Sequence, residues 1–356
     1  MTDVLIAGGG TGGHLFPGIA LAQEIRRRDP SARILFVGTA KGIETRAVPK
    51  AGFALELLPV TGLKRKGLVG FIAGLGRLPV AIIKAVGVVR RFKPHVAVSV
   101  GGYAAGPAVL AARMLGVPCV VMEQNAVPGL TNKLLASVAS TVIASLPTDR
   151  LRGDKVMVLG NPVRADLVPV RDCAYAPQTP LRVFVFGGSQ GARGINDAFI
   201  ALAPELNGLG ITLRHQTGEA DLKRVKDAYD AAGFTANVSA FIDDMASAYR
   251  DADLVICRAG ATSIAELTVC GRPSVLVPFP GATDDHQTAN AKALATTGAC
   301  IHIAQSPTVA HDLEMSLREL VGNHDRLRHM AQAAQSVGRP HAVSAIADVL
   351  EGVRRV

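Results

Sequence analysis

The chain has 356 residues, of which 49% are hydrophobic and 19% are charged, and tryptophan is absent. A chain of this length usually divides into two domains, and this much apolar material is enough for two cores, which excludes an intrinsically disordered protein. The net charge of +9 is uneven, because residues 1–162 carry +12 and residues 163–356 carry −3. A basic half beside a weakly acidic half indicates that one domain meets a polyanion or an anionic membrane.

The predicted elements alternate along the whole chain between short apolar runs and segments of helix length, which indicates βαβ units and parallel sheets. In the first half we expect strands at Asp3–Ala7, Ala32–Val37, His95–Val100, Pro118–Met122 and Thr141–Ala144, with a helix over Gly18–Arg28 that is entered after Pro17. In the second half we expect strands at Leu181–Phe186, Thr212–Gln216, Val238–Phe241, Leu254–Cys257, Ser274–Pro278 and Cys300–Ile303. Helices are expected over Asn196–Ala203, Ala220–Ala231, Thr262–Cys270 and His286–Thr296.

The two halves repeat one pattern, since each opens with an apolar strand, a glycine-rich turn and a helix. The break between them falls near the Gly-Asn-Pro turn at Gly160–Arg164, and the segment after Arg339-Pro340 reads as a helix that crosses back onto the first domain. We therefore predict an α/β protein with two Rossmann-like, doubly wound domains facing across a cleft. The expected bounds are residues 1–162 plus 340–356 for one domain and 163–339 for the other.

No transmembrane segment is expected. Residues 94–112 carry no Lys, Arg, Asp or Glu, but Gly101-Gly102 and Gly106-Pro107 suit a strand, a turn and a helix start better than a membrane span. The apolar stretch 67–89 is interrupted by Arg77, Pro79 and Lys84. The beginning of the chain also lacks a secretory signal, and the five cysteines have no disulfide or zinc spacing, so we expect a cytoplasmic protein with reduced thiols.

Three glycine-rich loops follow predicted strands, at residues 8–14, 101–106 and 187–192. Each lies at the carboxyl end of a strand, where open α/β sheets bind ligands, and glycine lets a polyanion approach amides at a helix N-terminus. The first loop contains GxGxxG, but a nicotinamide dehydrogenase would need an acid near the end of the second strand, and Val37-Gly38-Thr39 has none. Three such loops are better interpreted as binding two phosphate-bearing substrates than as binding one dinucleotide.

Seven segments together resemble one family: GGGTGGHLFPGIALA, VGGYAAGPAVLAA, EQNAVPGLTNK, GNPVR, FGGSQGARGIN, FIDDMASAY and CRAGATSIAEL. They look like the MurG family of peptidoglycan N-acetylglucosaminyltransferases, in the family's order and over nearly the whole chain. The resemblance implies the glycosyltransferase B fold, UDP-N-acetylglucosamine as donor, lipid I as acceptor, lipid II as product and no required cofactor. It also implies a peripheral protein at the cytoplasmic face of the bacterial inner membrane, with cell-wall synthesis and division proteins as partners.

The resemblance also implies roles for individual residues. The donor-binding positions are Thr11, Gly12, Gly13, Asn125, Arg164, Ser189, Gln190, Ile242, Ala261, Thr262, Ser263, Ile264, Ala265, Glu266 and Gln287, with Ile242 at the uracil and Glu266 at the ribose diol. The acceptor-binding positions are Gly12, Gly13, Gly102, Tyr103 and Asn125. The chain departs from the family twice. Met122 stands where a histidine often precedes the EQN triplet, and the loop at Asp284–Gln287 is one residue longer, which leaves open whether His286 or Gln287 contacts the sugar.

Transfer requires a base for the acceptor hydroxyl, and the sequence offers His14 and Glu123. An imidazole suits base work at neutral pH, although a phosphate-contacting His14 and a hydrogen-bonded, structural Glu123 are the alternatives. The leaving diphosphate can be stabilised without metal by amides at a helix N-terminus and by Arg164. The only DxD, Asp251-Ala252-Asp253, precedes a strand and is expected to cap it, so no metal site is predicted.

The stretch from Leu63 to Lys93 carries eight basic residues and no acid, interleaved with aliphatic ones. Such a surface suits docking on anionic lipid, with a core helix that has a solvated charged face as the alternative. The expected docking residues are Lys64, Arg65, Lys66, Leu68, Phe71, Ile72 and Leu75. Nucleic acid is not an expected partner, because stacking aromatics and binding motifs are missing. A transferase for another acceptor and a non-catalytic polyanion-binding module are the remaining alternatives.

Overall fold

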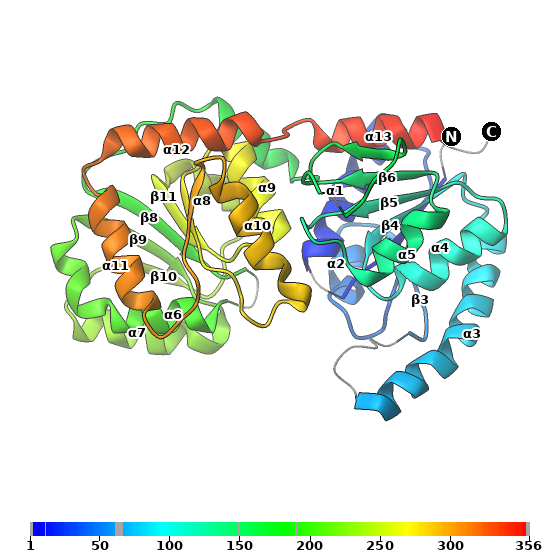
Figure 1. Ribbon diagram of the computed structural model, residues 1–356, viewed down its shortest axis with the longest axis horizontal. Helices are drawn as coiled ribbons and strands as arrows, with labels where there is room; N and C mark the ends of the chain where they lie inside the picture. Colours follow the sequence, from blue (N-terminus) through cyan, green and yellow to red (C-terminus); the bar gives the residue numbers. More distant parts are fainter. Residues whose placement is uncertain (1–2, 11, 61–66, 149, 189–190, 354–356) are drawn as a thin grey trace. The chain divides into compact units, whose positions relative to one another are not determined.

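The computed structural model describes residues 3–10, 12–60, 67–148, 150–188 and 191–353, and within 67–77 it describes the backbone alone. Two compact units make up the chain: unit 1 is Met1–Val163 with His341–Val356, and unit 2 is Arg164–Pro340. Each unit is a parallel sheet with helices on both faces (Figure 1). The expected pair of doubly wound α/β sheets is confirmed.

Within the described residues, unit 1 contains a seven-stranded parallel sheet in the order β3-β2-β1-β4-β5-β6-β7. Its strands are β1 (Val4–Gly8), β2 (Ile34–Gly38), β3 (Ala54–Leu57), β4 (Val96–Gly101), β5 (Cys119–Glu123), β6 (Thr141–Ala144) and β7 (Val156–Val158). Its helices are α1 (Gly12–Arg28), α2 (Glu44–Lys50), α3 (Gly67–Phe92), α4 (Ala105–Met114), α5 (Leu130–Val138) and α13 (Ala342–Val353). The order reverses between β1 and β4, so this is the switch point at which doubly wound sheets bind ligands.

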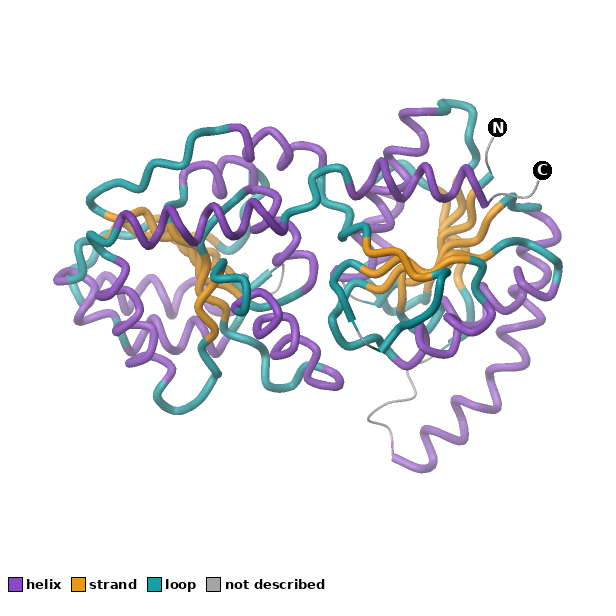
Figure 2. The backbone as a smooth tube through the Cα atoms, turned by 45° about the horizontal axis from the view of Figure 1, so that its top comes forward, coloured by secondary structure: helices purple, strands orange, loops and turns teal. Residues whose placement is uncertain are grey.

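Both faces of the first sheet are buried, as near-continuous apolar strands require. On one face, Ile6 and Val98 pack with Leu15 of α1, and α13 returns to the same cluster through Ile346 and Leu350. On the other face, side chains of α3, α4 and α5 cover the sheet. Figure 2 shows the strands between these two helical layers. The closing helix therefore belongs to the unit in which the chain begins.

The helix expected after Pro17 in fact begins five residues before it, at Gly12. Pro17 lies inside α1. A proline there removes only the one bond that its own N–H would donate to the carbonyl of Gly13, close to the helix start, where the penalty is smallest. The helix start therefore carries Gly12, Gly13 and His14 at the end of β1.

Unit 2 holds, among the residues that are described, a six-stranded parallel sheet in the order β10-β9-β8-β11-β12-β13, with its switch point between β8 and β11. Its strands are β8 (Leu181–Phe186), β9 (Ile211–Gln216), β10 (Asn237–Ser239), β11 (Leu254–Cys257), β12 (Ser274–Leu276) and β13 (Cys300–His302). Its helices are α6 (Arg193–Ala201), α7 (Leu222–Ala231), α8 (Met245–Asp251), α9 (Ala261–Cys270), α10 (His286–Ala295), α11 (Val309–Leu320) and α12 (His324–Val337). The strand expected at Leu254–Cys257 has the predicted bounds, whereas β10, β12 and β13 end earlier than predicted, so that Phe241, Pro278 and Ile303 lie in loops.

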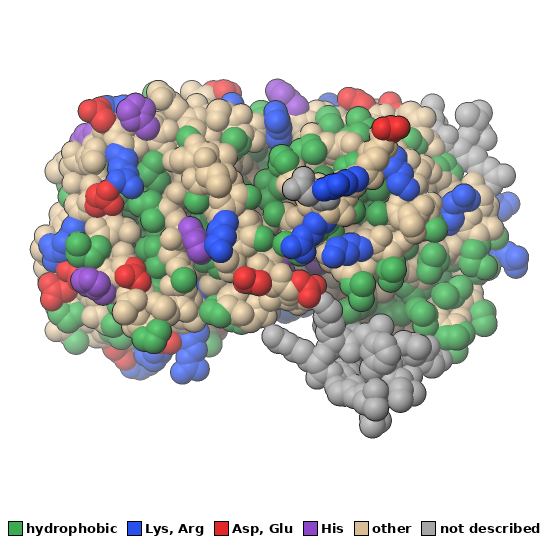
Figure 3. All heavy atoms as spheres, viewed as in Figure 1, with side chains coloured by type: hydrophobic (Ala, Val, Ile, Leu, Met, Phe, Trp, Pro, Cys, Tyr) green, Lys and Arg blue, Asp and Glu red, His purple; other side chains and the backbone are tan. Residues whose placement is uncertain are grey.

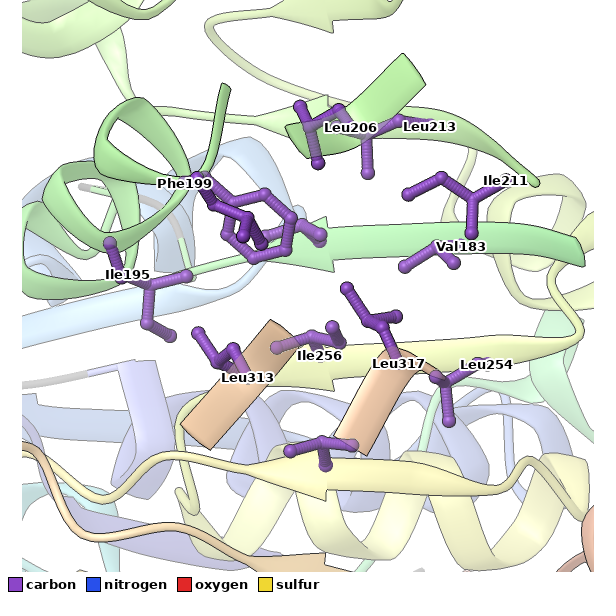
Figure 4. Close-up of a cluster of buried hydrophobic side chains, with 14 of the residues drawn as sticks. Val183, Ile195, Phe199, Leu206, Ile211, Leu213, Leu254, Ile256, Leu313 and Leu317 are labelled. Atoms are coloured by element: carbon purple, nitrogen blue, oxygen red, sulfur yellow. The ribbon is translucent and has the colours of Figure 1, made fainter. Parts of the chain in front are cut away.

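The core of unit 2 is built around Phe199, Leu313 and Leu317, which pack on Val183 and Ile256 of the central strands (Figure 4). Short 3₁₀ segments at Ala165–Asp172, Ala203–Gly208, Glu219–Asp221 and Thr283–Asp285 complete this unit. Across the described part of the chain, every helix is too short or too polar to span a membrane.

Candidate active site

Two of the three glycine-rich loops meet at the carboxyl edge of the first sheet. The amide of Gly9, after β1, donates to the carbonyl of Gly101, at the end of β4, over 3.3 Å. Gly102 has φ of +87°, and a Cβ there would overlap with the carbonyl oxygen of Gly9. Only glycine permits this approach, so the glycines at these positions allow the two loops to contact each other at the switch point of unit 1.

His14 lies in the first turn of α1 and points back across these loops. Its Nδ1 lies 3.2 Å from Oε1 of Gln124, the residue that follows β5. The imidazole also packs on Gly101, where a Cβ would come within 2.8 Å of the same Nδ1. The ring is only partly buried, so it faces both the protein and the edge of the sheet.

Glu123, the other candidate base, ends β5 and is fully engaged by its own loop. Its Oε1 accepts from the amide and the side-chain nitrogen of Asn125, and its Oε2 accepts from the amide of Gly129 and from Nδ2 of Asn132. The side chain is 1% exposed. Its two oxygens thus accept four hydrogen bonds, and this carboxylate stabilises the loop that carries Asn125.

A second buried carboxylate, Glu44 at the start of α2, supports the first glycine loop. It accepts from the amides of Gly10 and Thr39, each over 2.8 Å, and from the Thr39 hydroxyl. Cβ atoms at Gly9, Gly38 or Gly42 would overlap with its carboxylate. Burial would raise the pKa of Glu44, but these hydrogen bonds outweigh it and hold that pKa below its ordinary value.

Glu44 also alters the comparison with a dinucleotide site. The sequence shows no acid at the end of the second strand. In the structure, however, the Glu44 carboxylate lies beside that strand end, because it accepts a hydrogen bond from the amide of Thr39, the residue after β2. It is completely buried and already hydrogen-bonded. A ribose could not reach this carboxylate. A nicotinamide site is therefore still rejected, now because the acid is enclosed rather than because an acid is missing.

The other predicted substrate-binding residues of unit 1 that the structure describes lie at the same edge. Gly12 and Gly13 open α1, Asn125 follows Gln124, and Tyr103, after Gly102, is exposed. Thr11 falls outside the described residues, as do Lys64, Arg65 and Lys66, and the side chains of Leu68, Phe71, Ile72 and Leu75 are not described.

In unit 2 the loops after β8 and β11 flank the switch point. Ser189 and Gln190 of the third glycine-rich loop lie outside the described residues. Gly191 has φ of +75°, and a Cβ there would overlap with the carbonyl of Thr217, at the end of β9. This loop therefore needs glycine for the same reason as the first two, a close backbone contact.

The loop after β11 leads into α9, which contains the predicted nucleoside segment Ala261, Thr262, Ser263, Ile264, Ala265 and Glu266. Glu266 is buried in the second turn. Its Oε2 accepts from the Tyr249 hydroxyl over 2.9 Å, and its Oε1 lies 3.8 Å from Nε of Arg164. Burial raises the pKa of Glu266, against the charge of Arg164 and the Tyr249 hydrogen bond, which lower it.

Ile242 lies in the loop after β10, and Gln287 is the second residue of α10, which follows β12 in the chain. Ile242 is buried after β10, and Oε1 of Gln287 accepts from the amide of Phe279 over 2.9 Å. His286 lies 2.6 Å from the carbonyl of Thr283 through its Nδ1. In the longer loop, Asp284 and Asp285 both have φ above +50°, a region that non-glycine residues seldom adopt.

Asp253 of the DxD triplet lies at the opposite edge, where β11 begins. Its carboxylate accepts from the amide of Arg182 and is ion-paired with that guanidinium at 2.6 Å. Among the described residues, histidine, cysteine, aspartate and glutamate nowhere gather in a group of three or more that could hold a metal.

Sequence reasoning missed Gln124 and Glu44 at the carboxyl edge of the unit 1 sheet, and it missed Tyr249 beside Glu266 in unit 2. Gln124 lies inside the EQN triplet and Tyr249 inside FIDDMASAY, so each belonged to a segment that was already singled out. Glu44 had a weaker signal, the glycines at 38 and 42 that make room for its carboxylate.

Comparison with known proteins identifies the family. Residues 4–144 match the glycosyltransferase family 28 N-terminal domain, and residues 182–346 match the family 28 C-terminal domain. The chain belongs to glycosyltransferase family 28.

Relatives within family 28 match the chain over nearly its full length. A UDP-N-acetylglucosamine–N-acetylmuramyl-(pentapeptide) pyrophosphoryl-undecaprenol N-acetylglucosamine transferase of Myxococcus xanthus is 48% identical over 98% of this chain and 92% of its own length. The Geobacter metallireducens protein of the same name is 44% identical, over 99% of both chains. The resemblance to the MurG family is therefore confirmed.

Solved structures agree with this family 28 assignment. The crystal structure of Acinetobacter baumannii MurG superposes with a TM-score of 0.81 and 32% identity, over 99% of this chain and 100% of that one. A Neisseria meningitidis UDP-GlcNAc 2-epimerase bound to UDP-GlcNAc superposes with a TM-score of 0.68 at 13% identity, over 99% and 100% of the two chains. The second likeness shows a shared fold only.

Proposed function

We infer that this chain transfers N-acetylglucosamine from UDP-N-acetylglucosamine to undecaprenyl-pyrophosphoryl-N-acetylmuramoyl-pentapeptide (lipid I), which yields lipid II with a β-1,4 bond. The observation that carries this is the match over 98% of the chain, at 48% identity, to a transferase named for that donor and acceptor. The reaction is an inverting displacement. An acceptor hydroxyl attacks the anomeric carbon, the bond to the diphosphate breaks, and UDP leaves with the electron pair.

In this proposal His14 takes the proton of the acceptor hydroxyl. The contacts of the two candidates support the choice, because Glu123 is buried and accepts four hydrogen bonds, whereas His14 is partly exposed at the switch point. A general base must reach the proton that it removes, and a carboxylate enclosed by its own loop cannot. Unit 1 is then the acceptor domain, with Gly12, Gly13, Gly102 and Tyr103 around the acceptor.

Unit 2 is assigned to the donor. Glu266 supports the assignment, since one carboxylate oxygen is held by Tyr249 and the other lies 3.8 Å from Arg164, too far for a strong hydrogen bond. Ribose hydroxyls can donate to that second oxygen. The diphosphate is assigned to Arg164 and to the loop with Ser189 and Gln190, the uracil to Ile242, and the sugar to Asn125 and Gln287.

Gln287 suits a sugar contact for a further reason. Its amide oxygen accepts from Phe279, so the amide is oriented and its nitrogen can donate to a sugar hydroxyl. No cofactor is part of the proposal, and nucleic acid is not a partner in it.

The proposed location is the cytoplasmic face of the inner membrane, where lipid I resides, with cell-wall synthesis and division proteins as partners. Exposed apolar side chains support docking: Leu78, Val80 and Ile83 on α3, Met114 on α4, and Leu130 and Leu134 on α5. Exposed Lys84, Arg113 and Lys133 lie among them on the same helices. Figure 3 shows hydrophobic side chains gathered over α4 and α5. The docking residues expected from the sequence, Lys64, Arg65, Lys66, Leu68, Phe71, Ile72 and Leu75, are part of this proposal on the sequence pattern alone.

Release of UDP tests the function. UDP should form from UDP-N-acetylglucosamine only when a lipid I analogue is present, and the analogue should gain one N-acetylglucosamine. UDP formed equally well without acceptor would indicate hydrolysis and contradict the proposal. The same assay in excess chelator should keep its rate, because protein groups are assigned to the diphosphate. A metal-reversible loss would overturn that part.

A further inference from the structure

Gln124 is buried between two elements of unit 1, and its amide can be oriented from its contacts. Its Nε2 lies 3.2 Å from the carbonyl oxygen of Val100, in β4, and its Oε1 lies 3.2 Å from Nδ1 of His14. A backbone carbonyl can only accept a hydrogen bond, so the amide nitrogen must be the atom that faces Val100. The amide oxygen therefore faces His14.

This orientation determines the tautomer of the imidazole. An amide oxygen only accepts, so Nδ1 of His14 must carry the hydrogen and donate it to Gln124. In a neutral imidazole the other nitrogen is then the acceptor. The lone pair lies on Nε2, on the side of the ring turned away from Gln124.

We propose that Gln124 is a positioning residue, which holds His14 in the tautomer whose Nε2 can accept a proton. The inference rests on the proposed role of His14 as the base. It concerns a residue of the EQN triplet that contacts neither sugar in that proposal.

Packing gives the ring a defined place as well as a defined tautomer. Gly101 has φ of +88° and carries no Cβ, which would lie 2.8 Å from Nδ1 and 3.1 Å from Cε1 of His14. Gln124 is 1% exposed, so the hydrogen bond to Nδ1 is shielded from water on the Gln124 side. A shielded hydrogen bond holds a ring better than one that water can replace.

Three successive residues would then have three separate tasks. Glu123 accepts from Asn125, Gly129 and Asn132 and so shapes the loop, and Gln124 orients the base. Asn125 is assigned to the sugar. A neutral amide suits the middle position, because it orients the imidazole without placing another charge beside the buried Glu123 carboxylate.

The test is the tautomer of His14, read by ¹⁵N NMR of histidine-labelled protein at neutral pH. The His14 signals are those that disappear in His14→Ala. In the wild type we expect a protonated Nδ1 and an unprotonated Nε2. In Gln124→Leu we expect the Nε2-protonated form to appear, together with a fall in kcat of about tenfold, the size of one lost hydrogen bond, and an unchanged KM.

Ser140→Ala is the matched control, since Ser140 accepts a hydrogen bond from Cys119 at the other end of β5. It should change neither the tautomer nor kcat. Gln124→Met, of similar length, replaces Gln124→Leu if the latter does not fold. A wild-type His14 protonated at Nε2, or a tautomer and kcat that survive the loss of the amide, would overturn the proposal. Full turnover in His14→Ala would instead show that His14 is not the base of the proposed function. The tautomer measurement would still show whether Gln124 orients the imidazole.

Discussion

The two units use buried carboxylates at the carboxyl edges of their sheets in opposite ways. In unit 1, Glu44 accepts hydrogen bonds from Gly10 and Thr39, and Glu123 accepts four hydrogen bonds from its own loop. In unit 2, one oxygen of the Glu266 carboxylate accepts a hydrogen bond from Tyr249, and the other lies 3.8 Å from Nε of Arg164. A carboxylate whose two oxygens both accept hydrogen bonds from the protein supports a loop, whereas one with an oxygen still to satisfy can bind a ligand.

The comparison extends to the histidines. His14 of unit 1 is partly exposed at the edge of its sheet, whereas His215 of unit 2 is completely buried in the core. His215 lies 2.7 Å from the Tyr229 hydroxyl and 3.1 Å from Oδ1 of Asn196, a residue of α6. Both ring nitrogens are therefore satisfied inside the protein. His215 therefore serves the structure of unit 2, whereas the partly exposed His14 is the histidine that we propose as the base.

The largest expected effect is a loss of stability in acid that comes from unit 2. Burial lowers the pKa of His215 to about 3, so the unfolded chain binds a proton between about pH 6.5 and pH 3 that the folded chain does not. Stability must therefore fall as the pH falls through this window, by about 1.4 kcal/mol per pH unit and about 5 kcal/mol in all. Urea unfolding at a series of pH values measures the slope.

The control for this prediction is His215→Gln, which does not titrate. The variant is less stable at neutral pH, but the difference between the two proteins should shrink as the pH falls from 6.5 to 3. All other titratable groups are shared, so the difference isolates His215. A constant difference across the window would show that the buried ring does not govern acid stability.

The second effect tests the structural role of the unit 1 carboxylates. Glu123→Ala leaves the amides of Asn125 and Gly129 and the side chain of Asn132 without their acceptor. Of these groups only Asn132 is buried, and an unpaired buried donor costs about 1–3 kcal/mol, so we expect a loss of about that size in the free energy of unfolding. Glu56→Ala, which breaks an exposed ion pair with Arg91, should cost under about 1 kcal/mol. Similar losses in both variants would refute the distinction.

The third effect is on catalysis in unit 1. His14→Ala should lower kcat by about 10² or more, the usual scale for a lost general base. Steady-state kinetics with a lipid I analogue measure this, and the folding of the variant should be unaffected because the ring is only partly buried. Near-normal turnover would exclude His14 from the mechanism and return attention to the enclosed Glu123.

The fourth effect is on ligand binding in unit 2. Glu266→Ala should weaken UDP binding by about one to two decades, since a hydrogen bond to a charged group contributes about 1.5–3 kcal/mol. Calorimetry with UDP alone measures it, and Glu205→Ala, an exposed carboxylate of the same unit, is the control. An unaltered dissociation constant for Glu266→Ala would contradict the ribose assignment.

The sequence predicted the central strands well because they are continuous apolar runs between glycine turns, as in β1, β4, β8 and β11. It missed β3, whose residues are half-exposed, and the short edge strand β7, because neither has the apolar pattern of a buried strand. The start of α1 was wrong because Pro17 resembles a helix start, and only the tertiary position of Gly12 and His14 shows otherwise.

For the site, the sequence could place residues on loops but could not give their partners. The pairing of His14 with Gln124 joins positions 110 apart, and that of Glu44 with Gly10 joins positions 34 apart. Both depend on which strands are neighbours, and β1 lies between β2 and β4 only after the chain has reversed its order. Residue type alone left Glu44 unnoticed and left Glu123 an open candidate.

The smallest expected effect is on binding to membranes, which we expect to depend on exposed side chains of unit 1 and not on those of unit 2. On α3, Val80 is 58% exposed and Ile83 is 72% exposed, beside exposed Lys84. Side chains this exposed contribute little to the core, so Val80→Ser with Ile83→Ser should leave stability unchanged. A buried methylene contributes about 0.8 kcal/mol, so partial insertion of these two side chains predicts about tenfold weaker binding to anionic vesicles.

The control for membrane docking is Met315→Ser in unit 2, which removes a side chain of similar exposure, 52%, from α11. Vesicle sedimentation should separate the two variants, with Met315→Ser binding like the wild type. Transfer to a short-chain, water-soluble acceptor should be unchanged in both variants, because none of the three side chains lies at the carboxyl edge of a sheet. Added salt should weaken the binding that remains, since each basic residue near an anionic surface contributes about 1 kcal/mol of screened attraction. Undiminished binding by the α3 double variant would move the docking surface away from α3, and equal losses in both variants would mean that apolar exposure anywhere on the chain is enough.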